Sequence, residues 1–181
     1  MRISADSSLR AVAFIVCTAL DRAGLTAVLT GGGAATVYAP SAYQSRDLDF
    51  VLQFRGSTSE GPRALSLLGY RLSGNVYVHE ESELTLDFPP GPLMVGGDVL
   101  GRWDTLREDE LLLHIIDPTD SCRDRLAGFV FWNDRGSLHQ ALAVASSERT
   151  RVDLERIRDW CRREGKKEGF HEFERRLRAA S

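Results

Sequence analysis

The feature that most restricts the fold of this chain is a run from Thr26 to Leu52, which reads TAVLTGGGAATVYAPSAYQSRDLDFVL. Its first residues, Thr26–Thr30, are short, largely apolar and bounded by glycine, so they predict a buried strand. A brief helix is expected over Ala34–Ala39, because the residue before Pro40 is disfavoured in the helical conformation. The alternating segment Asp47–Leu52 predicts a second strand. Two strands joined through a helix predict a core that combines a sheet with helices.

The remaining elements complete an α+β pattern. A first helix is expected from Ser4 to Gly24, and either Ser4 or Asp6 can cap its start. Further elements are expected as a helix over Gly61–Leu68, a hairpin of Asn75–His79 and Glu83–Phe88, a strand over Leu111–Ile116, and helices over Thr119–Trp132, Ser137–Ala145, Val152–Arg163 and Gly169–Ala179. We therefore predict a small mixed sheet flanked by helices in an α/β core over residues 1–117. A C-terminal helical region packed on that core is expected over residues 118–181.

Composition excludes several classes of protein. The net charge of −3 argues against a polycation that coats nucleic acid. The three cysteines form no CxxC pair, which argues against a disulfide framework or a structural zinc site and favours a cytoplasmic setting. The apolar run AVAFIVCTAL has about half of the ~20 residues that a membrane span needs. We therefore expect a core helix there, and neither a membrane segment nor a signal peptide.

The glycine run is ambiguous when it is taken alone. Gly31, Gly32 and Gly33 stand between a strand and a helix, where a backbone without side chains can approach a ligand and free N–H groups attract anions. The run does not match the dinucleotide pattern G-x-G-x-x-G, because Thr36 stands at the last glycine position. It does not match the P-loop either, because no Gly-Lys-Ser/Thr follows. A plain tight turn explains the glycines equally well.

The two acids of the second strand suggest a cation site. Asp47 and Asp49 are two residues apart on a strand, so their side chains leave the same face, about 6–7 Å apart. Leu48, Phe50 and Leu52 leave the opposite face and are expected to fill the core. Two carboxylates at that spacing can share one or two hard cations. The alternative is an edge strand with a solvated acidic face.

A third acid fits the same site. In the segment Glu83–Phe88 the apolar residues alternate with Thr85 and Asp87. If this strand pairs beside Asp47–Leu52, Asp87 lies about 5 Å from the other two acids across the sheet. Three carboxylates so close repel one another unless a cation neutralises them, which suits a two-Mg²⁺ site. The alternative is a surface acid that precedes a Pro-Pro turn.

Together these residues resemble a known family. Gly32-Gly33, thirteen further residues and then Asp47-Leu48-Asp49-Phe50 resemble the signature of the nucleotidyltransferase superfamily related to DNA polymerase beta. Asp87, in LTLDF, is similar in place to the third carboxylate of that family. Within the superfamily the chain looks most like the minimal prokaryotic enzymes of the toxin–antitoxin and abortive-infection type. Gln44 departs from their pattern, which commonly has arginine at that position.

The resemblance implies a nucleotidyltransferase fold and a set of roles. Asp47, Asp49 and Asp87 would be the catalytic, metal-binding acids, with two Mg²⁺ ions as cofactor. The NTP substrate would be held by the residues that match the family's phosphate contacts, namely Gly32, Gly33, Ser45 and Arg125. A loop-capping role is an equal alternative for Ser45, and an ion pair with Asp124 or Asp134 is an equal alternative for Arg125.

The implied activity is transfer of a nucleoside monophosphate from an NTP to a hydroxyl of a protein or an RNA, with release of pyrophosphate. Asp87 would help to deprotonate the acceptor. The alternative is an inactive protein of the same fold that acts as a partner, antitoxin or regulator. A cognate toxin or antitoxin partner is expected, and neither a membrane nor DNA. The basic C-terminal helices could bind RNA, but acids alternate with their basic residues, as in ordinary solvated helices.

Overall fold

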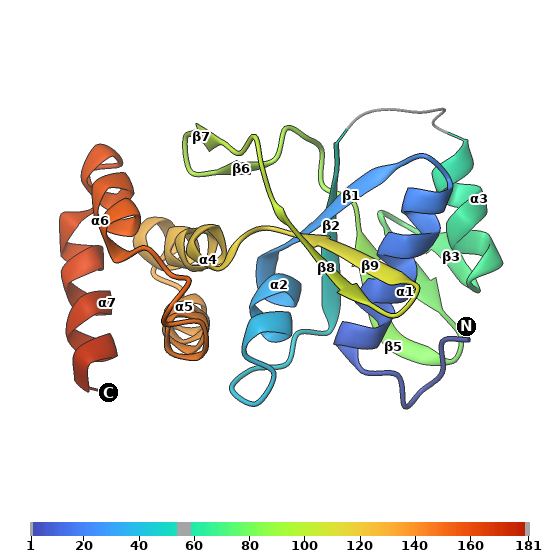
Figure 1. The fold of residues 1–181 in the computed structure, drawn as a ribbon, viewed down its shortest axis with the longest axis horizontal. Helices are drawn as coiled ribbons and strands as arrows, with labels where there is room; N and C mark the ends of the chain where they lie inside the picture. The colour runs from blue at the N-terminus through green and yellow to red at the C-terminus, as the bar shows by residue number, and fades with distance from the viewer. Residues whose placement is uncertain (1, 54–58, 180–181) are drawn as a thin grey trace.

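A mixed sheet of seven strands and a group of helices at one end of it make up the described part of the chain, residues 2–53 and 59–179 of this computed structural model (Figure 1). The strands follow the spatial order β3-β4-β5-β2-β1-β9-β8, and a separate ribbon pairs β6 with β7. The strand bounds are β1 Thr26–Thr30, β2 Asp47–Gln53, β3 Tyr70–Ser73, β4 Val76–His79, β5 Ser82–Asp87, β6 Met94–Val95, β7 Asp98–Val99, β8 Asp104–Glu108 and β9 Leu111–Ile115. The fold is therefore α+β, as predicted.

The strands around the glycine run lie side by side in the middle of the sheet. Strand β1 pairs antiparallel with β2, and Thr30 lies opposite Asp49. Strand β5 runs parallel to β2 on the other side and brings Asp87 opposite Asp49. Strand β9 runs parallel to β1, so the sheet is mixed. The predicted pairing of the β5 segment beside the acidic strand is confirmed.

The two faces of β2 differ from the simple alternation that the sequence predicts. Leu48 and Phe50 are fully buried, as expected, but Leu52 is 39% exposed, so its predicted place in the core is wrong. Val51 is buried instead, although it shares a face with the acids. The pairing with β5 extends only as far as Asp49, so beyond that residue the flanking strand no longer determines which face is covered. The turn at Gly91 lies near Val51 on this half of the strand.

Three helices accompany the sheet: α1 (Leu9–Arg22), α2 (Gly31–Tyr38) and α3 (Glu60–Leu67). Helix α1 contacts β1 and β9 and buries most of its residues. Its N-terminal cap is Ser8, whose hydroxyl accepts a hydrogen bond from the N–H of Ala11, so the predicted caps Ser4 and Asp6 are wrong. Each of these residues can cap a helix, and the periodic apolar pattern does not determine which one does.

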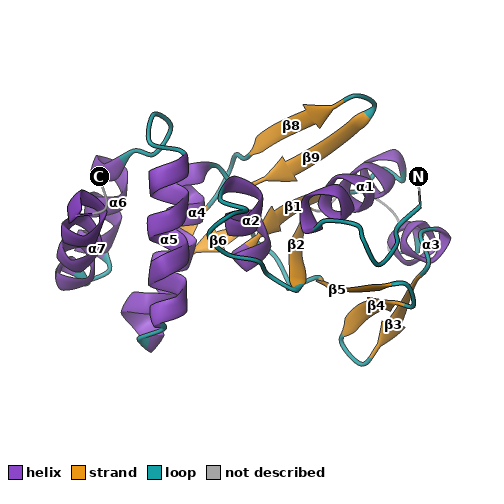
Figure 2. Cartoon of the chain, turned by 90° about the horizontal axis from the view of Figure 1, so that it is seen from below, coloured by secondary structure: helices purple, strands orange, loops and turns teal. Residues whose placement is uncertain are grey.

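Four helices follow the sheet: α4 (Pro118–Trp132), α5 (Arg135–Ser147), α6 (Leu154–Arg163) and α7 (Lys167–Ala179). They gather at one end of the molecule, with α2 between them and α1, in both views (Figures 1 and 2). Asp117 caps α4, where Thr119 or Asp120 was expected. One continuous cluster of buried apolar side chains reaches from Ile3 to Leu177 and includes both parts of the chain.

Several features of the described residues limit the chemistry of the chain. Cys17, Cys122 and Cys161 are unpaired and buried, and burial raises the pKa of the Cys17 and Cys161 thiols to about 12.

Among the helices that the structure describes, none combines the length and apolar character that crossing a membrane requires.

Strands β3 and β8 and the β6–β7 ribbon were not predicted from the sequence. Strands β3 and β8 are the two edges of the sheet, and most of their side chains are exposed. An edge strand with polar residues on its open side lacks the apolar run or clear alternation by which strands are recognised. Strands β6 and β7 have only two residues each, which is too short for any periodic signal.

Candidate active site

Strands β2 and β5 bring the three predicted acids to one place. Asp49 and Asp87 are direct neighbours in the parallel register, where adjacent strands lie about 4.8 Å apart. Asp47 precedes Asp49 by two residues on β2 and lies opposite Thr85 of β5. Residues at matched positions on paired strands point to the same face, so the three carboxylates share one side of the sheet.

Asp49 is the most perturbed member of this group. The pKa of its carboxyl is raised to about 6, first by burial and then by the negative charges of Asp47 and Asp87. The positive charge of Arg125 acts in the opposite direction. Asp47 is exposed, whereas Asp49 and Asp87 are half-buried. The negative charge of Asp49 is therefore unfavourable in its surroundings, which is a common property of carboxylates in cation-binding sites.

The donor atoms fit a hard divalent cation in kind, because all are carboxylate oxygens. Asp47 accepts a hydrogen bond from the Ser45 hydroxyl at 2.6 Å, and Asp87 accepts one from the N–H of Phe88 at 2.7 Å. Among residues 2–53 and 59–179, no group of three His, Cys, Asp or Glu side chains converges closely enough to hold a metal ion as it stands. Metal binding would therefore require these carboxylates to move closer together.

The glycines form the first turn of α2, where a loop before Ala34 was expected. Gly31 has a positive φ of 66°, and a Cβ at this position would overlap the Asp49 carboxylate. Glycine is therefore required at Gly31, a residue that the family pattern does not include. The predicted Gly32 and Gly33 are buried, and their missing side chains make room for Ser45 and for the backbone of Asp47.

The start of α2 has no side-chain cap. Thr30 is the N-cap residue, and its side chain makes no capping hydrogen bond; its hydroxyl donates to the carbonyl of Asp49 instead. The first N–H groups of a helix have no partner within the helix, and they carry a partial positive charge. An anion near Gly32 and Gly33 would therefore meet free donors.

The loop between α2 and β2 is held by its own hydrogen bonds. The N–H of Ser45 donates to the Thr36 hydroxyl at 3.0 Å, and the Ser45 hydroxyl is engaged with Asp47. The loop-holding alternative for Ser45 is thus present in the structure. The side-chain amide of Gln44 donates to the Pro40 carbonyl, so this side chain is turned back onto its own loop.

Arg125, on α4, pairs with Asp124 through hydrogen bonds of 2.7 and 3.0 Å and contacts Gln140 at 3.4 Å. The alternative partner Asp134 caps α5 instead, where it accepts hydrogen bonds from Gly136 and Ser137. The charge of Arg125 nevertheless lies within electrostatic reach of the acids, because it lowers the pKa of Asp49.

Two residues near this site were not predicted. Asp124 raises the pKa of Asp49, which makes it a fourth acid near the group. The sequence offered one indication of this role, because Asp124 stands next to Arg125 on a helix that directly follows a strand of the sheet. The ring of Tyr43 would lie 3.6 Å from a Cβ at Gly32, so an aromatic side chain stands beside the start of α2.

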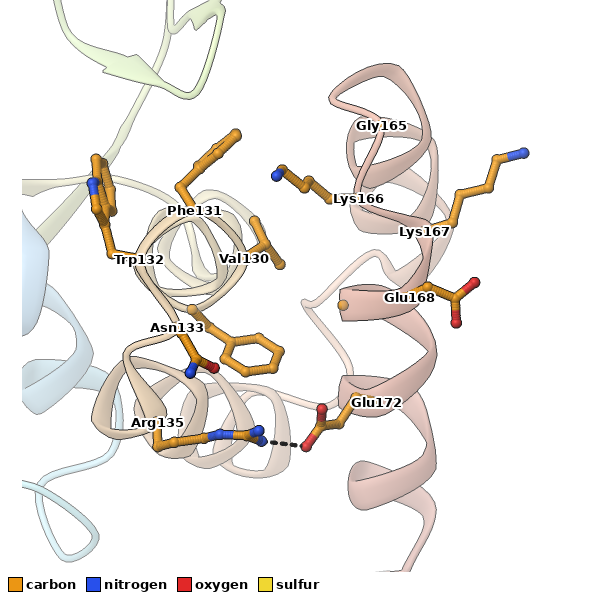
Figure 3. A pocket seen from close by; sticks show the side chains of 12 residues that line it. Val130, Phe131, Trp132, Asn133, Arg135, Gly165, Lys166, Lys167, Glu168 and Glu172 are labelled. Carbon is orange, nitrogen blue, oxygen red and sulfur yellow. Dashed lines mark hydrogen bonds and ion pairs between the residues drawn. The ribbon is translucent and has the colours of Figure 1, made fainter.

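The acids do not line the cavity that lies among the C-terminal helices. A cavity of about 870 Å³ lies between the end of α4 and the start of α7 (Figure 3). Its walls include Phe131, Trp132 and Lys166, and the Arg135–Glu172 ion pair spans one side (Figure 3). None of the predicted site residues contributes to it.

Searches of protein-family models, curated proteins and solved structures find no match to this chain.

Proposed function

We propose that this chain is a Mg²⁺-dependent nucleotidyltransferase with the fold of the superfamily related to DNA polymerase beta. It would transfer a nucleoside monophosphate from an NTP to a hydroxyl of a protein or an RNA. The observation that carries the proposal is the register of β2 and β5, which pairs Asp49 with Asp87 and keeps Asp47 on the same side. The raised pKa of Asp49 supports it, because a cation at this place would relieve the repulsion.

The three acids would hold the metal. Rotation of Asp47 away from Ser45, and of Asp87 away from the Phe88 N–H, would release the oxygens that hydrogen bonds now occupy. Bound Mg²⁺ would neutralise the triphosphate and stabilise the charge that develops on the attacking and leaving oxygens.

The other residues would bind and orient the nucleotide. The uncapped start of α2 would donate the N–H groups of Gly32 and Gly33 to phosphate oxygens. Arg125 would exchange part of its contact with Asp124 for a bidentate contact with phosphate, for which its planar group is suited. Tyr43 offers a ring against which a base could stack. Asp87 would accept the proton of the acceptor hydroxyl.

The experiment is a transfer assay with each of the four labelled NTPs, in which total cellular RNA and lysate protein serve as separate acceptor pools. With Mg²⁺ we expect label on one pool, and with EDTA none. Asp49→Asn should lower transfer on the order of 100-fold, because the charge of a central ligand is lost. Asp6→Asn, which changes an exposed acid in the turn before α1, is the matched control. Absence of transfer with all four nucleotides, together with no heat of Mg²⁺-nucleotide binding, would overturn the proposal.

A second candidate function is binding without turnover, as the partner, antitoxin or regulator in a two-protein system. It is favoured by the local hydrogen bonds of Asp47 and Asp87 and by the inward turn of Gln44, which together leave the acids without a ready ligand arrangement. In this case the protein should copurify with a stable partner, and calorimetry should detect neither Mg²⁺ nor nucleotide binding. Tight binding of Mg²⁺-NTP would rule this candidate out.

A further inference from the structure

A second, strongly basic cavity lies on the other side of α4. Its volume is about 430 Å³, and four arginines line it: Arg102, Arg123, Arg156 and Arg163. Arg123 and Arg125 are two positions apart on α4, so at about 100° per residue they leave nearly opposite sides of the helix. The basic cavity, here called the arginine pocket, is therefore separate from the candidate active site.

Carboxylates hold the arginines of the pocket in place. Asp98 of β7 accepts hydrogen bonds from Arg123 and from Arg163, the latter at 2.6 Å. Asp120 of α4 accepts from Arg123 at 2.6 Å and from Arg156 at 2.6 and 2.8 Å. Each acid is thus shared between two guanidinium groups, and the lining contains four cations against two anions. Two further acids contact lining residues without lining the cavity themselves: Asp117 accepts a hydrogen bond from Arg156, and Glu164 accepts one from the N–H of Gly97.

One buried donor of a residue that lines the pocket lacks an acceptor in the described chain, and so does a donor of a residue packed against it. The side chain of Arg123 is only 2% exposed, and its Nε–H has no hydrogen-bond partner among the described residues. The indole N–H of Trp160, which is also buried, lacks a partner in the same part of the chain. The Arg123 guanidinium lies 5.4 Å from the centroid of the Trp160 ring, so the two donors belong to one cluster. Buried donors without an acceptor are costly, and an acceptor that reached the Nε–H of Arg123 from the cavity would satisfy that donor.

Arg102 completes the cationic side of the pocket. It is exposed, and among the residues that the structure describes no hydrogen bond or ion pair involves it. Its charge is therefore not used by the fold in the way that those of Arg123 and Arg156 are. A guanidinium group matches the oxygen geometry of phosphate, and several of them converging on one cavity suit its charge and its number of acceptor oxygens.

We propose that the arginine pocket binds a phosphate group, either as free inorganic phosphate or as the phosphate of a phosphomonoester. The ligand oxygens would accept hydrogen bonds from the Nε–H of Arg123 and from the free donors of Arg102 and Arg163. Asp98 and Asp120 would remain as the groups that orient the guanidiniums.

The test is a titration of inorganic phosphate into the whole protein, followed by calorimetry and by the melting temperature. EDTA is present throughout, so that no cation can hold phosphate at the aspartates, and NaCl keeps the ionic strength constant. We expect saturable binding with a rise in melting temperature. Arg102→Gln and Arg163→Gln should each weaken binding about tenfold or more, since each removes a charge-assisted contact. Both residues are exposed, so these variants should fold.

Arg158→Gln is the matched control, because it removes an exposed arginine of α6 that pairs with Glu155 outside the pocket. Its phosphate affinity should equal that of the wild type. A parallel titration with ribose 5-phosphate separates the two sources: tighter binding than phosphate, with the same loss in Arg102→Gln, indicates a phosphomonoester. Equal or weaker binding indicates free phosphate. Absence of saturable binding of both ligands, or equal affinity in Arg102→Gln, Arg163→Gln and wild type, would overturn the proposal.

Discussion

Replacing Asp49 by asparagine should stabilise the metal-free protein, although the same change should lower the proposed transfer activity on the order of 100-fold. The folded structure raises the pKa of this carboxyl from its ordinary value of 3.8 to about 6, first through burial and then through the charges of Asp47 and Asp87. A difference of about 2 pH units corresponds to roughly 3 kcal/mol at 1.36 kcal/mol per unit. Because Asp49 is half-buried and solvent screens part of the effect, we expect a gain of about 1–3 kcal/mol at pH 7.5. The asparagine amide can also donate hydrogen bonds to the neighbouring carboxylates.

The sign of the pH dependence follows from the raised pKa. Between about pH 4 and pH 6 the folded protein binds more protons at this site than the unfolded chain, so the cost of the charged Asp49 grows as the pH rises. The difference between Asp49→Asn and wild type should be largest above pH 7, shrink as the pH falls through about 6 and vanish near 4. Chemical denaturation in EDTA across this range measures it, with Asp6→Asn as the exposed control. Added Mg²⁺ should stabilise the wild type more than the variant.

Two outcomes would refute this reasoning. If Asp49→Asn is less stable than the wild type at pH 7.5 in EDTA, the carboxylate is well satisfied in the fold and the repulsion that we infer does not exist. If the difference is the same at pH 4.5 and pH 7.5, charge is not its cause.

Two further predictions concern the backbone around the site. Gly31→Ala should destabilise the protein by about 2 kcal/mol or more, because the added methyl group would overlap Asp49 and alanine is strained at a positive φ. Gly24 also has a positive φ but faces open space, so Gly24→Ala should cost only about 1 kcal/mol in the same denaturation assay. A smaller loss for Gly31→Ala than for Gly24→Ala would show that the close approach is not restrictive. Asp134→Ala should cost about 1 kcal/mol at pH 7 through loss of the α5 cap. The hydrogen bond from Ser137 lowers the pKa of Asp134, so this contribution should be present above the ordinary carboxyl pKa and lost as the pH falls below it; a pH-independent cost would contradict the charge-assisted cap.

The central strands could be predicted from the sequence because the local pattern of apolar and polar residues in each of them is typical of a strand. Thr26–Thr30 and the acid-apolar alternation of β2 and β5 each predict a strand, and together they predicted that Asp87 would lie beside Asp49. The start of α2 was missed because glycine is a poor helix former, so the helix was expected to begin only at Ala34. What requires glycine at position 31 is the close approach of its backbone to Asp49, a contact between residues eighteen positions apart that no local pattern contains.

Three departures from ordinary folding preferences coincide at this one place. Gly31 adopts a positive φ beside Asp49 that admits no other residue easily, the start of α2 has no side-chain cap, and Asp49 holds a half-buried charge beside two others. The second and third cost stability, and an apolar residue at position 49 would remove the larger of these costs. Elsewhere in the described chain, Ser8, Asp117, Asp134 and Asp153 cap their helices with side-chain hydrogen bonds. Local conflicts that gather at one point of a fold are typical of functional sites. A cation between the carboxylates and an anion at the helix start would relieve the second and third together, and a metal–triphosphate complex supplies both charges.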